Sequence, residues 1–180
     1  MLDLSAYGKN DIRGVYNEDV TEEVFYYTGK GFVKYLANQT GKQNSEIWVT
    51  VCRDARLHSP SLSKALIDGI LSSGANVVDM GLAPTPLGYY SEAVGLPPNI
   101  TKYSPITGAL IVTASHNPSQ YNGLKMTYNK QSLNEEQIKE VKEAKIVEEV
   151  VEATECTCDS TCTQCDSCTC AQADTTVVAQ

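Results

Sequence analysis

An apolar strand that ends in a tight polar loop is the feature that most constrains the fold of this chain. Residues 109–112, Ala-Leu-Ile-Val, have the short, apolar and β-branched character of a buried strand. The chain then reads Thr-Ala-Ser-His-Asn-Pro up to Pro118, and proline can continue neither a strand ladder nor a helix. Ser115, His116 and Asn117 must therefore lie where the strand ends. A hydroxyl group in this place faces a ligand rather than the core, so Ser115 is a candidate nucleophile.

Predicted strands alternate with predicted helices along most of the chain. Hydrophobic patterns predict strands at residues 12–15, 47–51, 76–80, 109–112 and 124–128, the last as an edge strand. Capping and proline signals predict helices at residues 22–36 and 61–71, a short helix from Pro84, and a further helix after Asn134. This alternation predicts an α/β fold, a three-layer α/β/α sandwich with a mostly parallel mixed sheet. Ligands of such folds gather at the carboxyl ends of the strands.

Charge is distributed unevenly along the chain, whose formal net charge is −8. Residues 1–134 hold 11 acidic and 11 basic residues, residues 135–155 hold eight glutamates and three lysines, and residues 156–180 hold three aspartates and no base. A neutral domain with an acidic extension argues against nucleic acid or an anionic membrane as a partner. No apolar run has membrane-spanning length and no secretory signal is evident, so we expect a cytoplasmic location.

Several segments resemble those of one enzyme family. The TASHNP segment, followed by Tyr-Asn-Gly-Leu-Lys at residues 121–125, is similar to the phosphoserine loop of the α-D-phosphohexomutases, the phosphoglucomutase and phosphomannomutase superfamily. Asp-Ile-Arg-Gly at residues 11–14, Arg-Asp-Ala-Arg at 53–56 and the turn at 81–86 match further family segments in order. The resemblance implies that residues 1–146 form domain I, the first of four in the family, and that the chain is a fragment.

The resemblance implies an isomerase that moves a phosphoryl group between the 1- and 6-hydroxyls of a hexose phosphate. It assigns the carrier role to Ser115 and places Lys125 and Arg13 at the reacting phosphate, where cations offset developing negative charge. It places His116 and Asn117 in the catalytic loop, as residues that shape it and supply hydrogen bonds. A hexose 1,6-bisphosphate is the implied phosphoryl donor.

A magnesium ion is the implied cofactor of the complete enzyme. Its ligands would be the phosphate on Ser115 and an aspartate-rich loop of DGDxDR type, an oxygen-rich set that suits Mg²⁺. This sequence contains no such loop. We therefore expect the chain alone to lack full mutase activity, and we expect its partners to be a hexose phosphate and the missing domains of the same enzyme.

Alternative interpretations of these residues stay open. Arg53, Asp54 and Arg56 fit a salt-bridge cluster that supports the loop better than they fit direct substrate contacts. A hydrolase triad is disfavoured, because Ser115 and His116 are adjacent on an extended segment, where neighbouring side chains point apart. A different hypothesis for the whole chain is a non-catalytic phosphosugar-binding or interaction module with a metal-binding tail. Two departures from the family pattern, Asn10 and Cys52, put the local packing beside both arginine loops in question.

Residues 147–180 form a tail that is first acidic and then cysteine-rich, and its composition predicts disorder because it cannot build a core. The C-x-C and C-x-x-C spacings could place several thiolates around a soft metal ion. A non-native tail and a tail of reduced, metal-free thiols are the alternatives. The six candidate ligands, out of seven cysteines in the chain, are Cys156, Cys158, Cys162, Cys165, Cys168 and Cys170.

Thiol titration with and without Zn²⁺ distinguishes these interpretations of the tail. A metal-binding tail predicts that Zn²⁺ slows the reaction of its thiols with a thiol reagent, because a coordinated thiolate is a weaker nucleophile than a solvated one. Thiol reactivity that Zn²⁺ leaves unchanged would rule out the metal site.

Overall fold

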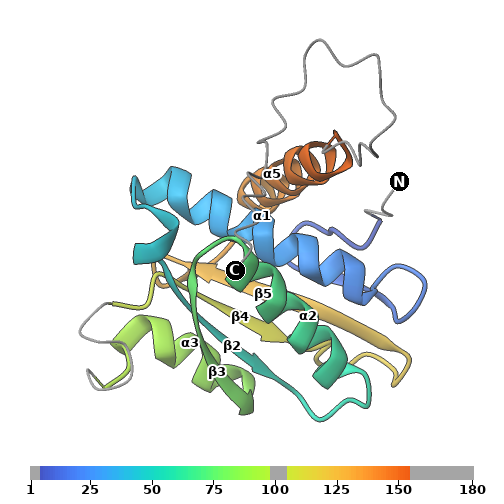
Figure 1. Cartoon of the computed structure of the whole chain (residues 1–180). Helices are drawn as coiled ribbons and strands as arrows, with labels where there is room; N and C mark the ends of the chain where they lie inside the picture. The colour runs from blue at the N-terminus through green and yellow to red at the C-terminus, as the bar shows by residue number, and fades with distance from the viewer. Residues whose placement is uncertain (1–4, 98–104, 155–180) are drawn as a thin grey trace, which may run out of the picture.

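A computed structural model of the protein describes residues 5–97 and 105–154 (Figure 1). In this part of the chain a six-stranded sheet has the order β1-β5-β4-β2-β3, with β6 paired to β5. Strand β2 pairs in parallel with β3 and β4, whereas β5 is antiparallel to both β4 and β1. Strand β6 is likewise antiparallel to β5, so five of the described strands run in one direction and β5 runs against them, which confirms the mostly parallel mixed sheet. The strands are β1 (Ile12–Val15), β2 (Trp48–Arg53), β3 (Asn76–Leu82), β4 (Gly108–Val112), β5 (Tyr121–Tyr128) and β6 (Gln131–Ser132).

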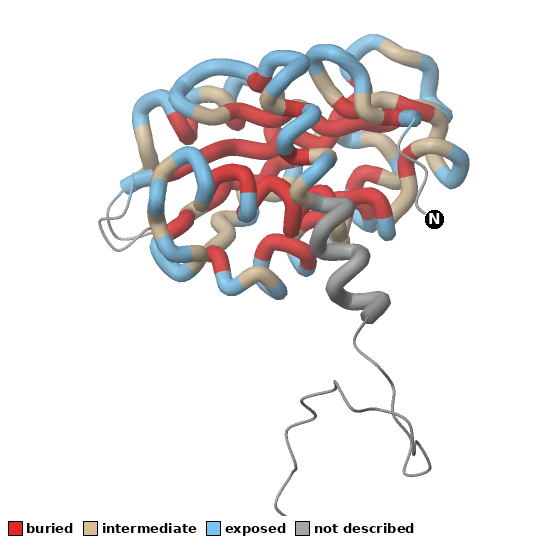
Figure 2. The backbone as a smooth tube through the Cα atoms, turned by 90° about the horizontal axis from the view of Figure 1, so that it is seen from above, coloured by how far each residue is buried: buried red, intermediate tan, exposed pale blue. Residues whose placement is uncertain are grey.

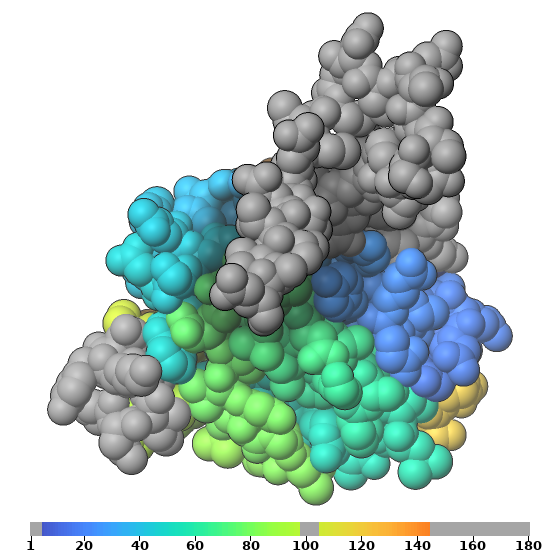
Figure 3. Space-filling model, viewed as in Figure 1, coloured from blue at the N-terminus to red at the C-terminus, as the bar shows by residue number. Residues whose placement is uncertain are grey.

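Helices cover both faces of the sheet and give the expected three layers. Helices α1 (Glu22–Thr40), α2 (Ser59–Ser72) and α5 (Glu135–Thr154) lie on one face, and α3 (Thr85–Val94) lies on the other (Figure 1). A short 3-10 helix, η1 (Asn44–Glu46), precedes β2. The space-filling view shows α2 in green over the middle of this side of the molecule (Figure 3). The fold class expected from the sequence is therefore confirmed.

Local signals in the sequence set the ends of the helices. The Thr21 hydroxyl accepts a hydrogen bond from the Val24 amide at the start of α1, and Gly41 ends that helix in the left-handed conformation. Helix α1 therefore continues past the expected end at residue 36. Helix α2 begins at Ser59, two residues before the expected start, because Pro60 fits its first turn. Asn134 and Gln137 exchange side-chain and main-chain hydrogen bonds at the start of α5.

The prediction of an edge strand at residues 124–128 was wrong. Strand β5 begins at Tyr121, lies between β1 and β4, and is mostly buried, as Figure 2 shows for the middle of the sheet. Its polar residues Asn122 and Lys125 resemble those of an edge strand. The burial is decided by β1, which returns from the N-terminus and pairs with the first half of β5.

Two cores of unequal size lie on the two faces of the sheet. The larger one packs alternate strand residues, such as Val51, Leu110 and Leu124, against α1, α2 and α5. The smaller one joins Cys52 and Ile111 to the base of α3. Desolvation by burial, with a further contribution from the charge of Asp79, raises the pKa of Cys52 to about 11, so this thiol is an inert packing group.

The two departures from the family pattern are accommodated in different ways. Cys52 faces α3 at Gly88, where an added Cβ would lie 3.1 Å from the cysteine sulfur, so the absence of a side chain at Gly88 makes room for the thiol. Asn10 is exposed.

The C-terminal part of the chain is described only to the end of α5. The domain boundary expected after residue 146 falls within this helix, which continues to Thr154. The six tail cysteines, Cys156 to Cys170, lie outside the described residues, so their metal-binding role stays a prediction. In the described part of the chain, no helix is long and apolar enough to cross a membrane.

Close packing of α1 against α2 predicts that Gly69→Ala destabilises the fold. An added methyl group would collide with the Tyr26 carbonyl oxygen of α1, although alanine is favoured over glycine within a helix by about 1 kcal/mol. We expect a net loss of about 3 kcal/mol in the free energy of unfolding, measured by urea denaturation. Gly41→Ala is the matched control. There the methyl group meets open space but φ is 68°, so we expect a loss of about 1 kcal/mol. A Gly69→Ala variant as stable as the parent protein would contradict the close approach.

Candidate active site

Ser115 lies in a strained turn at the carboxyl end of β4. Its φ angle is 56°, in the left-handed region that a residue with a side chain seldom adopts. The Thr113 hydroxyl accepts a hydrogen bond from the Ser115 amide at 3.0 Å, and the Asn117 amide donates to the Ala114 carbonyl at 3.1 Å. These bonds hold the turn while the Ser115 side chain stays exposed. Its Oγ lies 3.4 Å from His116 Nδ1, so the expectation that these two side chains point apart on an extended segment was wrong, because the left-handed φ of Ser115 turns the chain there. Such strain is typical of functional sites.

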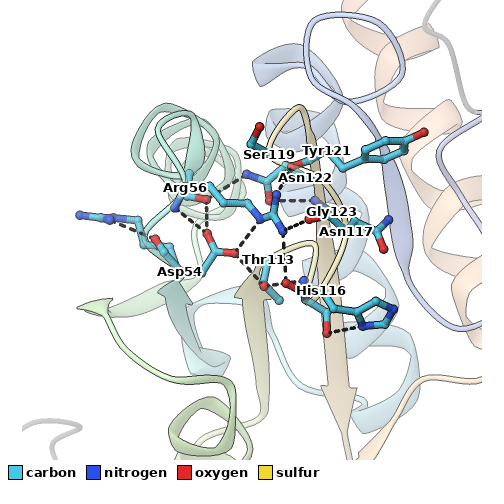
Figure 4. A network of polar contacts seen from close by, with 12 residues as sticks. Asp54, Arg56, Thr113, His116, Asn117, Ser119, Tyr121, Asn122 and Gly123 are labelled. Carbon is cyan, nitrogen blue, oxygen red and sulfur yellow. Dashed lines mark hydrogen bonds and ion pairs between the residues drawn. The ribbon is translucent and has the colours of Figure 1, made fainter.

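The Arg56 guanidinium binds the main chain of this loop through hydrogen bonds to its carbonyl oxygens (Figure 4). It donates to the carbonyl oxygens of Asn117 and Pro118 at 2.7 Å each, of Tyr121 at 3.1 Å and of Ser115 at 3.2 Å. A planar guanidinium carries five donors in a fixed fork, so a single side chain can fix the path of the whole loop.

Asp54 orients Arg56 and connects it to the loop. Its Oδ2 accepts from Arg56 Nε at 3.2 Å and from the Thr113 hydroxyl at 2.8 Å, while its Oδ1 accepts from the Ser59 hydroxyl at 2.6 Å and the Arg56 amide at 3.1 Å. Partial burial acts to raise the pKa of Asp54, but these hydrogen bonds and the Arg56 charge outweigh it and lower the pKa below its ordinary value. Arg53 makes a longer contact, 3.4 Å from its Nη1 to the Asp54 carbonyl.

Two cations on the adjacent strands β1 and β5, Arg13 and Lys125, both bind the carboxylate of Asp11. Asp11 Oδ2 accepts from Arg13 Nη2 at 2.6 Å and from Lys125 Nζ at 3.2 Å. Arg13 Nη1 donates to Asn117 Oδ1 at 3.2 Å, and this bond ties the cluster to the Ser115 loop. The Arg13 Nε is buried without a hydrogen-bond partner. Two segments far apart in sequence, residues 11–13 and residues 117–125, therefore bring two cations to one cluster that is bonded to the loop.

An open pocket of about 720 Å³ adjoins the loop on the side of α2. Ser115, Asn117, Arg56, His58 and Tyr16 are part of its wall. Arg13 and Lys125 are not in this wall; Arg13 donates to Asn117, which is, and Lys125 is linked to Arg13 through Asp11. Ser115 therefore lies in the wall of a cavity of ligand size, in a loop that Asn117 ties to the two cations.

Magnesium does not have a ligand set in the described part of the chain. No group of three or more His, Cys, Asp or Glu side chains there could hold a metal ion. The carboxylates near the loop, Asp54 and Asp11, already accept from cations and hydroxyl groups. A phosphate on Ser115 would be the one ligand these residues could offer, so the implied cofactor is not accommodated by them alone.

Four residues of this region were not assigned a role from the sequence. Asp11 belongs to the same Asp-Ile-Arg-Gly motif as Arg13 and lies directly before β1, and this i, i+2 spacing could have identified it. Asn122 is in the Tyr-Asn-Gly-Leu-Lys segment, yet full burial of its amide could not be expected. His58 and Tyr16 lie outside every quoted motif. Their rings stack at 4.5 Å because the fold brings together the segments that follow β1 and β2 in the chain.

The lowered pKa of Asp54 predicts a pH-dependent loss of stability in Asp54→Asn. A carboxylate with a depressed pKa stabilises the fold above its unfolded pKa, ordinarily about 3.9, and this stabilisation is lost as the pH falls through its folded pKa. We expect the variant to lose about 1–3 kcal/mol of unfolding free energy at pH 7. The difference from the parent protein should shrink below about pH 4. Urea denaturation at several pH values measures it, and a constant difference from pH 3 to pH 7 would contradict this role.

Comparison with known proteins identifies the family. A protein-family model described as phosphoglucomutase/phosphomannomutase, alpha/beta/alpha domain I, matches residues 5–153. A probable phosphoglucosamine mutase of Thermococcus gammatolerans is 42% identical over 120 residues, which cover 67% of this chain and 23% of the relative. A phosphomannomutase/phosphoglucomutase of Pseudomonas aeruginosa is 34% identical over 142 residues, covering 79% of this chain and 28% of the relative.

A solved structure agrees with these relatives. The crystal structure of a phosphoglucomutase/phosphomannomutase family protein from Burkholderia thailandensis superimposes with a TM-score of 0.70 at 31% identity, covering 83% of this chain and 31% of that one. The chain thus spans about a quarter of the length of the curated relatives it matches. Its motifs, its sheet order and these matches agree, and the chain belongs to the phosphoglucomutase/phosphomannomutase family, in the part described as alpha/beta/alpha domain I.

Proposed function

We propose that this chain is the phosphoserine-loop domain of a phosphohexomutase and that Ser115 carries the phosphoryl group. The observation that carries the proposal is the strained turn of Ser115, with an exposed hydroxyl, in a loop that Asn117 ties to Arg13 and, through the shared carboxylate of Asp11, to Lys125. Phosphoryl transfer asks a protein chiefly for positioning and for neutralisation of charge. Both are present in this arrangement.

The residues divide the work of the transfer between them. The Ser115 Oγ forms a bond to phosphorus as the bond from phosphorus to the donor sugar oxygen breaks, and the serine proton passes to that sugar oxygen, which departs as a hydroxyl group. The Arg13 guanidinium and the Lys125 ammonium offset the charge that develops on the phosphoryl oxygens. The Arg56 and Asp54 pair keeps the loop in place, which spares the reaction the cost of ordering it. We assign no step to Mg²⁺ in this chain.

The substrate we propose is a hexose phosphate, with a hexose 1,6-bisphosphate as phosphoryl donor. The matched relatives are named as a probable phosphoglucosamine mutase and as a phosphomannomutase/phosphoglucomutase. Mutases with these names share this chemistry. Because the chain matches about a quarter of their length, we propose that a full mutase cycle also needs the unmatched parts of such an enzyme. These parts are the partners, and the sources of Mg²⁺ ligands, that the proposal requires.

Ser115→Ala tests the carrier role directly. The purified chain is incubated with glucose 1,6-bisphosphate, and phosphate incorporation at each serine is measured by mass spectrometry of peptides. We expect the variant to lose all incorporation, because alanine has no nucleophile. Ser119→Ala, in the same loop and exposed, is the matched control and should accept phosphate as the parent chain does.

Persistent phosphate incorporation in Ser115→Ala would show that the carrier assignment is wrong. The alternative, a phosphosugar-binding module without catalysis, predicts instead that the parent chain binds glucose 1-phosphate in calorimetry while no serine is phosphorylated. The same calorimetric titration of Ser115→Ala should then give unchanged affinity.

A further inference from the structure

His58 lies between the Ser115 loop and the buried start of β5. Its Nε2 is 3.1 Å from the Ser119 carbonyl oxygen, and its Nδ1 is 2.7 Å from the side-chain nitrogen of Asn122. The imidazole stacks on the Tyr16 ring at 4.5 Å, with 13° between the planes. A residue with three such contacts is held in one orientation.

The surrounding bonds fix which nitrogen of His58 carries a proton. The Asn122 Oδ1 accepts from the Gly123 amide at 2.8 Å, so its nitrogen must face His58. The same nitrogen donates at 2.9 Å to the Ser59 hydroxyl, which in turn donates to Asp54. The amide of Asn122 is therefore the donor to His58, whose Nδ1 must accept and so carries no proton. The Nε2 then carries the proton and donates to the Ser119 carbonyl.

His58 and Tyr16 bind the part of the loop that Arg56 does not reach. The Arg56 contacts cover the carbonyl oxygens of residues 115, 117, 118 and 121. The Ser119 carbonyl accepts from His58, and the Gln120 carbonyl accepts from the Tyr16 amide at 2.9 Å. The contacts of His58 and Tyr16 thus fall between those of Arg56 at residues 118 and 121 and complete the anchoring of the loop.

We propose that His58 is a positioning residue of the phosphoserine loop, and that its neutral Nε2–H form is the one that holds the loop in the competent conformation. This inference rests on the proposed function, because Ser115 is the group being positioned. His58 acts through the Ser119 carbonyl and through the buried amide of Asn122, and it touches no reacting atom.

Protonation of His58 would break this arrangement. An imidazolium places an N–H at Nδ1, opposite the N–H groups of Asn122, and two donors cannot share this contact. The charged and titratable groups around the ring are Glu22 of α1, the Tyr16 hydroxyl that donates to Glu22, and Asp54 and Arg56 in the pocket wall. Partial burial acts to raise the pKa of Glu22, but hydrogen bonds from Ser61 and Tyr16 lower it below the ordinary value. Glu22 is therefore an anion that would attract the imidazolium form of His58. The loop should therefore loosen when His58 is protonated.

Two substitutions separate the contacts of His58. In His58→Gln the side chain still offers a hydrogen-bond donor and an acceptor at a similar distance from the main chain, but the amide does not titrate near neutral pH. His58→Phe keeps a flat ring to stack on Tyr16 and removes both polar contacts. The chain has two histidines, so in either variant any remaining histidine signal belongs to His116.

The experiment has a spectroscopic and a kinetic part. Long-range ¹H–¹⁵N spectra of the histidine rings report the tautomer of His58 in the full chain, and backbone amide spectra report the loop. The initial rate of Ser115 phosphorylation by glucose 1,6-bisphosphate is measured from pH 5.5 to pH 8. The phosphates of glucose 1,6-bisphosphate also titrate in this pH range. Their effect is the same for the parent chain and for His58→Gln, so the ratio of the two rates removes it.

We expect the neutral Nε2–H form in the parent chain, with the amide shifts of Ser119 and Gln120 changing at the titration midpoint of His58. At pH 8, His58→Phe should be slower by about three- to tenfold, the effect of one neutral hydrogen bond, while His58→Gln stays close to the parent rate. Below pH 6 the parent should slow by a similar factor relative to His58→Gln. A neutral Nδ1–H form, or loop amides that ignore the titration of His58, would overturn the proposal.

The two parts distinguish this inference from the proposed function. If the parent chain takes up no phosphate but the tautomer and the loop shifts are as expected, the carrier role of Ser115 fails and the positioning of the loop by His58 stands. If Ser115 is phosphorylated equally fast in the parent and in His58→Phe at every pH, the carrier role stands and the positioning role of His58 fails.

Discussion

The Arg56 guanidinium binds four carbonyl oxygens of the loop that carries Ser115, and the rest of the site is arranged around this contact. The loop follows a central strand and turns back into another, so its main chain has no ladder partners of its own. The Arg56 cation supplies four of these partners, and His58 and the Tyr16 amide supply those of Ser119 and Gln120. Asp54 keeps the guanidinium in place, and its own carboxylate is stabilised by the hydroxyl groups of Thr113 and Ser59. The strained φ of Ser115 persists because this network fixes both flanks of the turn.

The reversed direction of β5 brings the cations to this loop. Strand β5 returns directly from the Ser115 loop beside β4, and β1 then pairs with its outer side. Arg13 and Lys125 thereby reach one carboxylate, although they are far apart in sequence. The Asn117 side chain connects this cluster to the loop. A ligand phosphate beside Ser115 would compete with Asp11 for the two cations, which would leave them partly free of their ion pairs during the reaction.

Much of the fold followed from local patterns in the sequence. The alternation of strands and helices predicted the layers, and Thr21 and Pro60 predicted the starts of two helices to within two residues. The placement of β5 was wrong, because a strand containing Asn122 and Lys125 has the composition of an edge. Its burial depends on pairing with β1, which lies more than 100 residues earlier in the sequence, and no local pattern carries information on such a distant pairing.

The sequence by itself determined that Ser115 follows a buried strand in a turn, since proline and small polar residues exclude other local structures there. It also determined the family, because the motifs are specific in residue type and spacing. Only the tertiary structure decided what each polar side chain contacts. The same carboxylate or imidazole can face solvent or a buried amide, and the difference is set by which strands and helices pack together. The chain from Asp54 through Ser59 and Asn122 to His58 exists because β2, α2 and β5 meet at one point, and hydrogen bonds form only between groups that the fold brings within about 3 Å.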